Sequence, residues 1–222
     1  GGNPWKLYLQ RYSFQRSWPA IPAGTEMEYL GDEDHILPSM TPDSCVNTFS
    51  GSDLGGALIA WDRANTVFSQ RRHFVMTQQV RWERDFGKTA DTPTYWDTPF
   101  QPSTQALADS TYPDIARILR RAPTEVEKPR SMIVWEGGGE QSGCYPPRPK
   151  EIMAQHCQYG QPPTQHPLWP NEEMIDPGPG NYFQERPLVQ TGKTHTASVL
   201  WYDDRAGSCG LAFTRLFDMH KL

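Results

Sequence analysis

Proline interrupts this sequence so often that long regular elements are excluded over much of its length. The 222 residues include 21 prolines and 18 glycines, and each proline removes an amide donor and fixes its own φ. Leu, Ile, Val and Phe together make up about 18% of the chain, below the roughly 20% at which a core becomes hard to build. Eight Trp and nine Tyr supply large apolar areas with few rotatable bonds. We therefore expect one loop-rich domain over residues 1–222, anchored by aromatic side chains.

Alternating and apolar runs predict short strands. The clearest signal is Phe74–Phe86, where mostly apolar residues alternate with Arg81, Glu83 and Asp85; this pattern favours a strand, with an amphipathic helix as the alternative. Two apolar runs around Asp203–Gly207 predict a hairpin. Strands are predicted over residues 6–14, 73–86, 131–135, 195–202 and 210–217. Extended segments rich in Pro and Gly are expected near residues 15–56, 88–112 and 160–194.

Two further segments predict short helices. Pro113–Arg121 has an acidic residue in its first turn and basic residues near its end, which is typical of helix termini. Pro149–Tyr159 is followed by Gly160 in the position of a left-handed cap. Gly137, Gly138 and Gly139 predict a flexible turn after the strand over 131–135. The predicted fold is mainly β, with large irregular content, two short helices and long Pro/Gly-rich loops, and we recognise no internal repeat.

Charge and cysteine usage exclude several classes of function. The net charge of −5 argues against electrostatic capture of nucleic acid. The apolar runs are far shorter than the roughly 20 residues that cross a bilayer, so no membrane partner is expected. The cysteines at 45, 144, 157 and 209 lack C-x-x-C spacing, which favours reduced thiols over disulfides. Gly1 opens the chain without Met, which we interpret as a processed start lacking its targeting information, and we expect a cytoplasmic location.

Motifs for catalysis, cofactors and metals are weak. Gly192-Lys193-Thr194 resembles the end of a phosphate-binding loop, but Pro187 stands where that loop needs Gly. The six histidines lack the spacing of a helical metal site, and the adjacent His156 and Cys157 would diverge on a helix. Asp203 and Asp204 would face opposite ways on a strand. We therefore predict no catalytic residues, no metal site, no cofactor and no enzymatic activity.

One Pro/Gly motif indicates a partner. In the segment Asp176–Tyr182, proline fixes one residue as extended and glycine permits positive φ at the next, so the backbone kinks before an aromatic ring. The motif resembles the P-G-P-G-x-Y signature of sperm-tail PG-rich repeat proteins, a family associated with ciliary and flagellar microtubules. The matching residues are Pro177, Gly178, Pro179, Gly180 and Tyr182. The resemblance implies a tubulin lattice as partner and the ciliary axoneme as location, and this chain carries one copy where several are usual.

Aromatic residues in Pro-rich loops predict contacts with other subunits, because rigid rings fill pockets at little entropic cost. The predicted partner-binding residues are Tyr95, Trp96, Phe100, Trp169 and Phe183, together with the motif at 177–182. The leading hypothesis is a non-enzymatic structural component of a large assembly. One alternative is a viral capsid subunit, located in the virion, whose β-sandwich or jelly-roll core carries interlocking loops. A second alternative is a carbohydrate-binding domain with Trp169 or Trp201 as stacking platforms.

Overall fold

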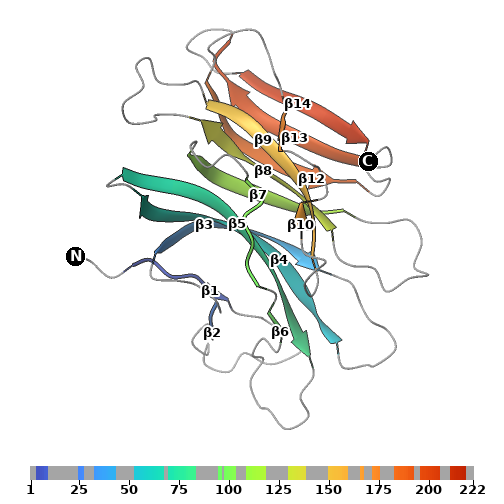
Figure 1. Cartoon of the computed structure of the whole chain (residues 1–222). Coiled ribbons are helices and arrows are strands. Elements are labelled where there is room, and N and C mark those ends of the chain that lie inside the picture. The colour runs from blue at the N-terminus through green and yellow to red at the C-terminus, as the bar shows by residue number, and fades with distance from the viewer. Residues whose placement is uncertain are drawn as a thin grey trace, which may run out of the picture.

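The computed structural model of the chain is built from β-strands (Figure 1). It describes residues 4–9, 25–27, 33–43, 53–67, 70–83, 95–96, 98–103, 109–118, 130–138, 150–159, 166–167, 172–175, 183–192, 196–205 and 211–218. Of these residues 80% lie in strands and none lies in a helix. The mainly β fold class is therefore confirmed within this part of the chain.

Three antiparallel sheets follow one another along the chain, after a small pair of strands near the N-terminus. That pair is β1 (Tyr8–Leu9) and β2 (Thr25–Glu26). The first sheet consists of β3 (Asp34–Asp43), β4 (Asp53–Val67), β5 (Gln70–Glu83) and β6 (Tyr95–Trp96). The middle sheet consists of β7 (Ser110–Arg117), β8 (Arg130–Gly138) and β9 (Lys150–Gln158), and β10 (His166–Pro167) and β11 (Glu173–Met174) both pair with β9. The third sheet consists of β12 (Gln184–Thr191), β13 (Thr196–Asp203) and β14 (Leu211–Asp218).

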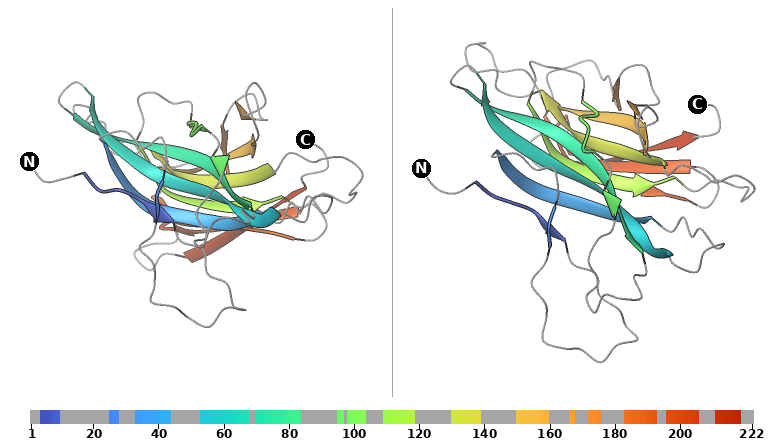
Figure 2. Two further views of the ribbon diagram at one scale, coloured as in Figure 1. Left: turned by 90° about the horizontal axis from the view of Figure 1, so that it is seen from below. Right: turned by 60° about the horizontal axis from the view of Figure 1, so that its bottom comes forward.

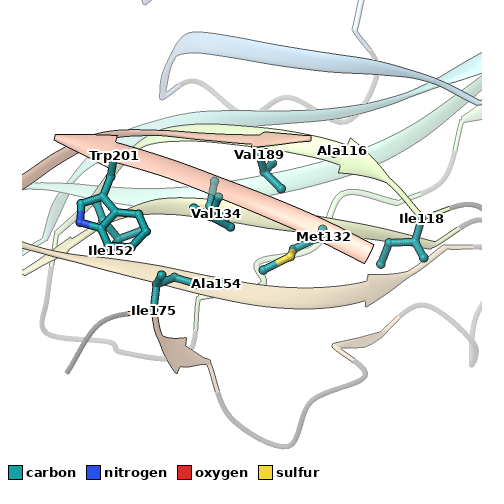
Figure 3. Close-up of a cluster of buried hydrophobic side chains, with 11 residues drawn as sticks. Ala116, Ile118, Met132, Val134, Ile152, Ala154, Ile175, Val189 and Trp201 are labelled. Carbon is teal, nitrogen blue, oxygen red and sulfur yellow. The ribbon is translucent and has the colours of Figure 1, made fainter. Parts of the chain in front are cut away.

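The sheets stack in chain order, with their strands in broadly similar directions (Figure 2), as in aligned sheet packing. Side chains alternate between the two faces of a strand, and β8 shows the result. Ile133 and Trp135 pack with residues of the first sheet, whereas Met132 and Val134 pack with residues of the third. Figure 3 shows the second of these clusters, between the middle and third sheets. Burying one sheet on both faces lets a chain poor in aliphatic residues form a continuous core.

A further cluster covers the outer face of the first sheet. Leu7 and Leu9 of the β1 segment and Met27 after β2 pack on Ala57, Ile59, Trp61, Met76 and Val80. The described part of the chain is therefore a stack of four layers: the β1–β2 pair, the first sheet, the middle sheet and the third sheet.

The two predicted helices are wrong over residues 113–117 and 150–158, which lie in strands of the middle sheet. Residues 110–117 form β7, and Pro113 lies at a break in its pairing with β8 rather than in the first turn of a helix. Residues 150–158 form β9, which is buried at residues 152–157 on both faces. A strand buried on both faces loses its two-residue alternation and is not distinguished from a buried helix by periodicity.

Three other segments correct or refine the prediction. Residues 34–43 and 184–191, expected in loops, are β3 and β12. Gly137 and Gly138, expected in a flexible turn, end β8. A Cβ on Gly137 would lie 2.5 Å from Cγ of Met153, so a close approach of β9 explains the glycine. The strand at 73–86 and the hairpin at 195–217 are confirmed as β5 and as β13–β14.

Each sheet begins with the same irregular strand. β3, β7 and β12 each contain a register shift, and at each shift a non-glycine residue with positive φ precedes a proline. These residues are Leu37 (φ 51°), Tyr112 (φ 51°) and Arg186 (φ 52°). Such backbone conformations are uncommon for residues other than glycine, and the strands bend at such bulges.

A buried tryptophan lies opposite each of these bulges. In the first sheet, Ile36 and Ser39 flank the bulge and pair with Asp62 and Ala60, so Trp61 lies between the two pairs. The same register places Trp135 opposite the bulge of β7 and Trp201 opposite that of β12. The three tryptophans are 0%, 0% and 3% exposed. The absence of an internal repeat is therefore corrected: the structure contains three three-stranded units with the same bulge and the same tryptophan.

The units stack with one polarity. We call the side of each unit that carries its buried tryptophan the Trp face of that unit. The Trp face of the third unit packs on the middle unit, the Trp face of the middle unit packs on the first, and the Trp face of the first unit packs on the β1–β2 layer. In the second and third units, the Trp face therefore covers the side of the preceding unit that lies away from that unit's own tryptophan.

Polar contacts connect the layers as well. Asp114 of the middle sheet accepts hydrogen bonds from Ser39 Oγ of the first sheet at 2.5 Å and from the Val189 amide of the third at 2.8 Å. The Tyr159 hydroxyl lies 2.7 Å from both Thr77 Oγ1 of the first sheet and Ser131 Oγ of the middle sheet. Hydrogen-bonded polar groups of this kind fix the register of one sheet on the next.

Candidate functional site

Four of the predicted partner-binding residues are described, three beside β5 of the first sheet and Phe183 at the start of β12 in the third. Tyr95 and Trp96 form β6, at the edge of the first sheet, where they pair with Arg81 and Val80. Phe100 pairs with Thr77 through two backbone hydrogen bonds, and its ring centroid lies 5.7 Å from that of Tyr159. Phe100 is therefore packed against the core. Trp169, Pro177, Gly178, Pro179, Gly180 and Tyr182 lie outside the described residues.

Phe183 is the one predicted aromatic anchor whose described side chain is largely exposed, at 44%. Its amide donates to Asp204 Oδ1 at 2.8 Å, and its carbonyl accepts from the Asp204 amide at 3.3 Å. The backbone at the start of β12 is thus fixed against the end of β13 while the ring faces solvent.

The thiol and imidazole at 156–157 are not arranged for nucleophilic chemistry. Both residues are buried on β9, where successive side chains point to opposite faces. Cys157 is a free cysteine in the cluster between the first and middle sheets, and burial raises the pKa of its thiol. A thiol that is buried and protonated is inert as a nucleophile.

The adjacent carboxylates at 203–204 have separate structural roles. Asp203 is 1% exposed and accepts hydrogen bonds from the Arg205 amide at 2.8 Å, from Arg205 Nη2 at 2.5 Å and from Gln184 Nε2 at 3.1 Å. Burial disfavours its charge, but these hydrogen bonds outweigh burial and lower the pKa of Asp203 to about 2. Asp204 faces the other way, toward Phe183. Trp201 is 3% exposed, too buried to stack on a sugar.

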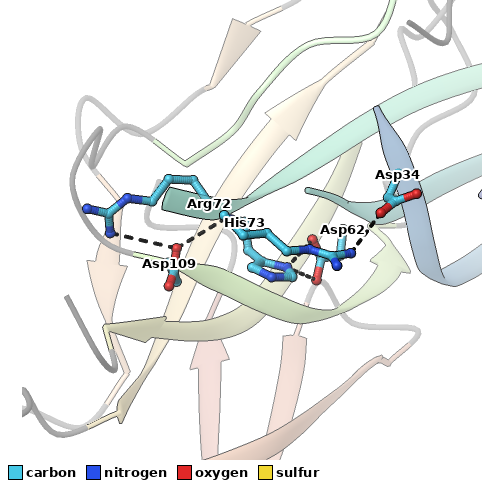
Figure 4. A network of polar contacts seen from close by, with 6 residues as sticks. Asp34, Asp62, Arg72, His73 and Asp109 are labelled. Atoms are coloured by element: carbon cyan, nitrogen blue, oxygen red, sulfur yellow. Dashed lines mark hydrogen bonds and ion pairs between the residues drawn. The ribbon is translucent and has the colours of Figure 1, made fainter. Parts of the chain in front are cut away.

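Figure 4 shows a polar network at the end of the first sheet. His73 Nδ1 lies 3.0 and 2.9 Å from the two carboxylate oxygens of Asp62, which is fully buried. The hydrogen bond with Asp62 raises the pKa of His73, and burial raises the pKa of Asp62. Asp109, which precedes β7, accepts from the His73 amide at 3.2 Å. The network joins the first and middle sheets.

The middle sheet has an ion pair at the equivalent position. Asp62 pairs across the strands with Val75, and His73 lies two residues before Val75; Glu136 pairs with Ile152, and Lys150 lies two residues before Ile152. Lys150 Nζ lies 3.1 Å from Glu136 and 3.2 Å from Glu185 of the third sheet. Burial opposes the charge of Lys150, but the hydrogen bonds and charges of the two glutamates outweigh it and raise its pKa. Glu136 also accepts from the Arg186 amide at 2.8 Å.

The outer face of the third sheet differs from the equivalent faces of the first and middle sheets, which another sheet covers. Side chains on β13 alternate between buried and exposed along the strand, and the exposed set includes two large apolar residues, Leu200 (43%) and Tyr202 (55%). Leu188 of β12, 57% exposed, is directly opposite Leu200. We call the outer side of this sheet the open face and define it by Leu188, Gln190, Ser198, Leu200, Tyr202 and Thr214.

Sequence reasoning missed the open face. The run His195–Tyr202 predicted one strand of a hairpin, and nothing in it distinguishes buried Val199 and Trp201 from exposed Leu200 and Tyr202. The one available signal was that apolar residues occupy both alternating sets of β13, which requires a covering layer on each side. Among the described residues, a layer covers the Trp201 side and none covers the other.

Within the described residues, no group of three or more His, Cys, Asp or Glu side chains is placed to hold a metal ion. Nor does any helix in the same part of the chain have the length and apolarity to cross a membrane. No family model, curated protein or solved structure matches the chain. What this chain does is therefore inferred from its own residues.

Proposed function

We propose that this chain is a non-enzymatic structural component of a large protein assembly and binds its neighbours through exposed apolar surface. The observation that carries the proposal is the open face, where Leu188, Leu200 and Tyr202 are each more than 40% exposed side by side on one sheet. Contiguous exposed apolar side chains on a sheet are typical of protein–protein contact sites.

Exposed apolar residues elsewhere support an assembly role. Trp5 is 71% exposed and Tyr8 64% exposed on the β1 layer, and Met40 is 58% exposed on β3. Tyr112, at the bulge of β7, is 45% exposed. Large aromatic residues at the surface are the residue types that most often dominate binding between proteins.

A test compares the protein in its native source with the isolated chain. Sedimentation velocity of native extract, followed by immunodetection, should place the chain in particles much heavier than its 25.3 kDa. Hydrogen exchange at two segments, the edge strands β12 and β14 of the third sheet, should be slower in the native particle than in the isolated chain. A 25 kDa species with protected amides in both segments, in extract and in isolation alike, would refute an assembly role.

A microtubule partner is the more specific form of the proposal. It is supported by the resemblance at Pro177, Gly178, Pro179, Gly180 and Tyr182. Co-pelleting with polymerised tubulin tests it, with Tyr182→Ala expected to weaken pelleting and Tyr112→Ala as a matched aromatic control. Equal pelleting of both variants argues against the motif as the contact, and no pelleting of the wild type argues against tubulin.

A capsid subunit is the second candidate, supported by the stacking of antiparallel sheets over a common core. The strand order differs from a jelly roll: the main strands of each sheet pair with sequence neighbours within the described residues, without the long-range pairings of two Greek keys. Electron microscopy of negatively stained native particles separates the candidates, because closed icosahedral shells support a capsid and decorated filaments support microtubules.

A further inference from the structure

We propose that the open face packs against the same face of a second copy of this chain, which supplies the layer that the stack lacks. The inference rests on the proposed function, since it identifies the partner of one surface of an assembly component. Three observations carry it: the polarity of the stack, the faces that a second copy can offer, and the charge of the open face.

The polarity of the stack shows what kind of surface covers this face. Ala60, Val134 and Leu200 occupy equivalent positions opposite the residue that follows each bulge proline. Ala60 is covered by the middle sheet and Val134 by the third sheet. Leu200, the third member of the series, is 43% exposed. At the two covered positions the covering surface is the Trp face of another sheet of this chain, so an antiparallel sheet face is the kind of surface that fits the third.

A second copy has one comparable sheet face to offer. Among the described residues, Trp61 and Trp135 lie in clusters covered by the β1–β2 layer and the first sheet, and Trp201 lies in the cluster with the middle sheet. The remaining sides of the first and middle sheets are buried against the next sheet. In the described part of each copy, two sheet faces stay uncovered: the open face, and the outer side of the short β1–β2 pair, where Tyr8 is exposed. Of these two, the open face belongs to a full three-stranded sheet, which favours a face-to-face pair.

The charge of the open face permits such a pair. A two-fold axis brings the same face of both copies together, and residues near the axis meet their own copies, so a face of one charge would repel its copy. In the third sheet, Tyr202 occupies the position equivalent to Asp62 and Glu136. Its cross-strand partner is Ala212, and Gly210, two residues before Ala212, occupies the position equivalent to His73 and Lys150. The six residues that define the open face carry no charge. Two charged residues share the register of this face: Glu185, opposite Tyr202, is paired with Lys150, and Asp218, opposite Thr196, is the last residue of β14. Arg186 and Asp204 follow Glu185 and Asp203 at the other end of the sheet.

The test uses opposite charges at the centre of the face. Leu200→Lys and Leu200→Glu are each compared with wild type and with Met40→Lys, which introduces the same charge at an exposed apolar residue of the first sheet. Circular dichroism and thermal unfolding of each variant confirm folding before association is measured by sedimentation velocity. We expect the wild type and Met40→Lys to dimerise equally, and each Leu200 variant to raise the dimer Kd by at least about 100-fold. An equimolar mixture of Leu200→Lys and Leu200→Glu should restore the dimer.

The outcomes separate this inference from the proposed function. Dimers that persist in both Leu200 variants, or a mixture that stays monomeric although each variant is folded, overturn face-to-face packing. A Leu200→Lys variant that still binds wild type at full affinity also overturns it, because one intact open face then suffices and the partner surface lies elsewhere. A purified wild type that is monomeric at all concentrations refutes self-association while native particles in extract still support an assembly role. A monomer in extract as well refutes both.

Discussion

Replacing Lys150 with Met should destabilise the protein more than replacing Glu136 with Gln, although each change removes the same ion pair. The side chain of Glu136 is 3% exposed and that of Lys150 is 33% exposed. In Lys150→Met the buried carboxylate keeps the Arg186 amide but loses its cation. Breaking a buried pair in this way costs about 3–5 kcal/mol, and the partial exposure of Lys150 places the expected loss near the lower end.

Replacing Glu136 should cost less stability than replacing Lys150, because it leaves no buried charge without a partner. In Glu136→Gln, Lys150 keeps Glu185 at 3.2 Å and its contact with water, and the glutamine oxygen can still accept from the Arg186 amide. The expected loss is about 1 kcal/mol, close to that of one net hydrogen bond. The double variant leaves no buried charge without a partner, so it should cost less than Lys150→Met alone, with a coupling energy of about 2 kcal/mol.

Urea unfolding, followed by tryptophan fluorescence at neutral pH, measures the free energy of unfolding of the wild type, the two single variants and the double variant. Their m-values must be equal for these free energies to be compared. Lys150→Arg, which keeps the charge, is the matched control and should lose less than about 1 kcal/mol. Equal losses for the two single variants, with a double variant equal to their sum, would show that Glu136 is solvated rather than buried beneath the third sheet.

Three other predictions concern backbone, core and pH. Arg186→Gly should leave stability unchanged or raise it by up to about 1 kcal/mol, because glycine relieves the positive φ, whereas Gln190→Gly on the same strand should lose about 0.5–1 kcal/mol; urea unfolding compares them, and equal losses would contradict the bulge. Tyr159→Phe should cost about 1–3 kcal/mol by removing a buried hydroxyl between two sheets, and no loss of thermal stability would place that hydroxyl in water. His73 binds its proton more tightly when folded, so its contribution is present below its ordinary pKa of 6.5 and is lost as pH rises through the raised value. His73→Gln should flatten the dependence of the unfolding free energy on pH above that ordinary value, and an unchanged slope would refute the pairing.

The sequence predicts strands well where one face meets solvent or charge. β5 was predictable because charged residues alternate with apolar ones up to Glu83, and the β13–β14 hairpin because two apolar runs flank a polar turn. β7 and β9 were mistaken for helices because central strands carry apolar residues on both faces. In β7, Pro113 occurs in a bulge and also suits the first turn of a helix, and only the pairing with β8 distinguishes these two uses.

The repeated unit could not be found by comparing the sequence with itself, because few residues recur and their spacing varies. The bulge proline precedes the opposing tryptophan by 23 residues in the first unit (38 to 61), by 22 in the second (113 to 135) and by 14 in the third (187 to 201). What recurs is a backbone requirement, a left-handed residue before a proline opposite a large ring. Leu, Tyr and Arg all meet it, so side-chain identity carries little of the signal.

The three units also explain why exposed apolar surface gathers on the open face. Each unit is a three-stranded sheet too thin to bury both of its own faces, so it needs a neighbour on each side, as the units of a repeat protein do. The β1–β2 layer meets this need for the first unit, and the two other units meet it for the middle one. In the third unit, the side that carries Trp201 packs on the middle sheet, and the other side exposes Leu188 and Leu200. Polar substitutions there should therefore change association and leave folding intact, whereas the same substitutions at Ala60 or Val134 should unfold the stack.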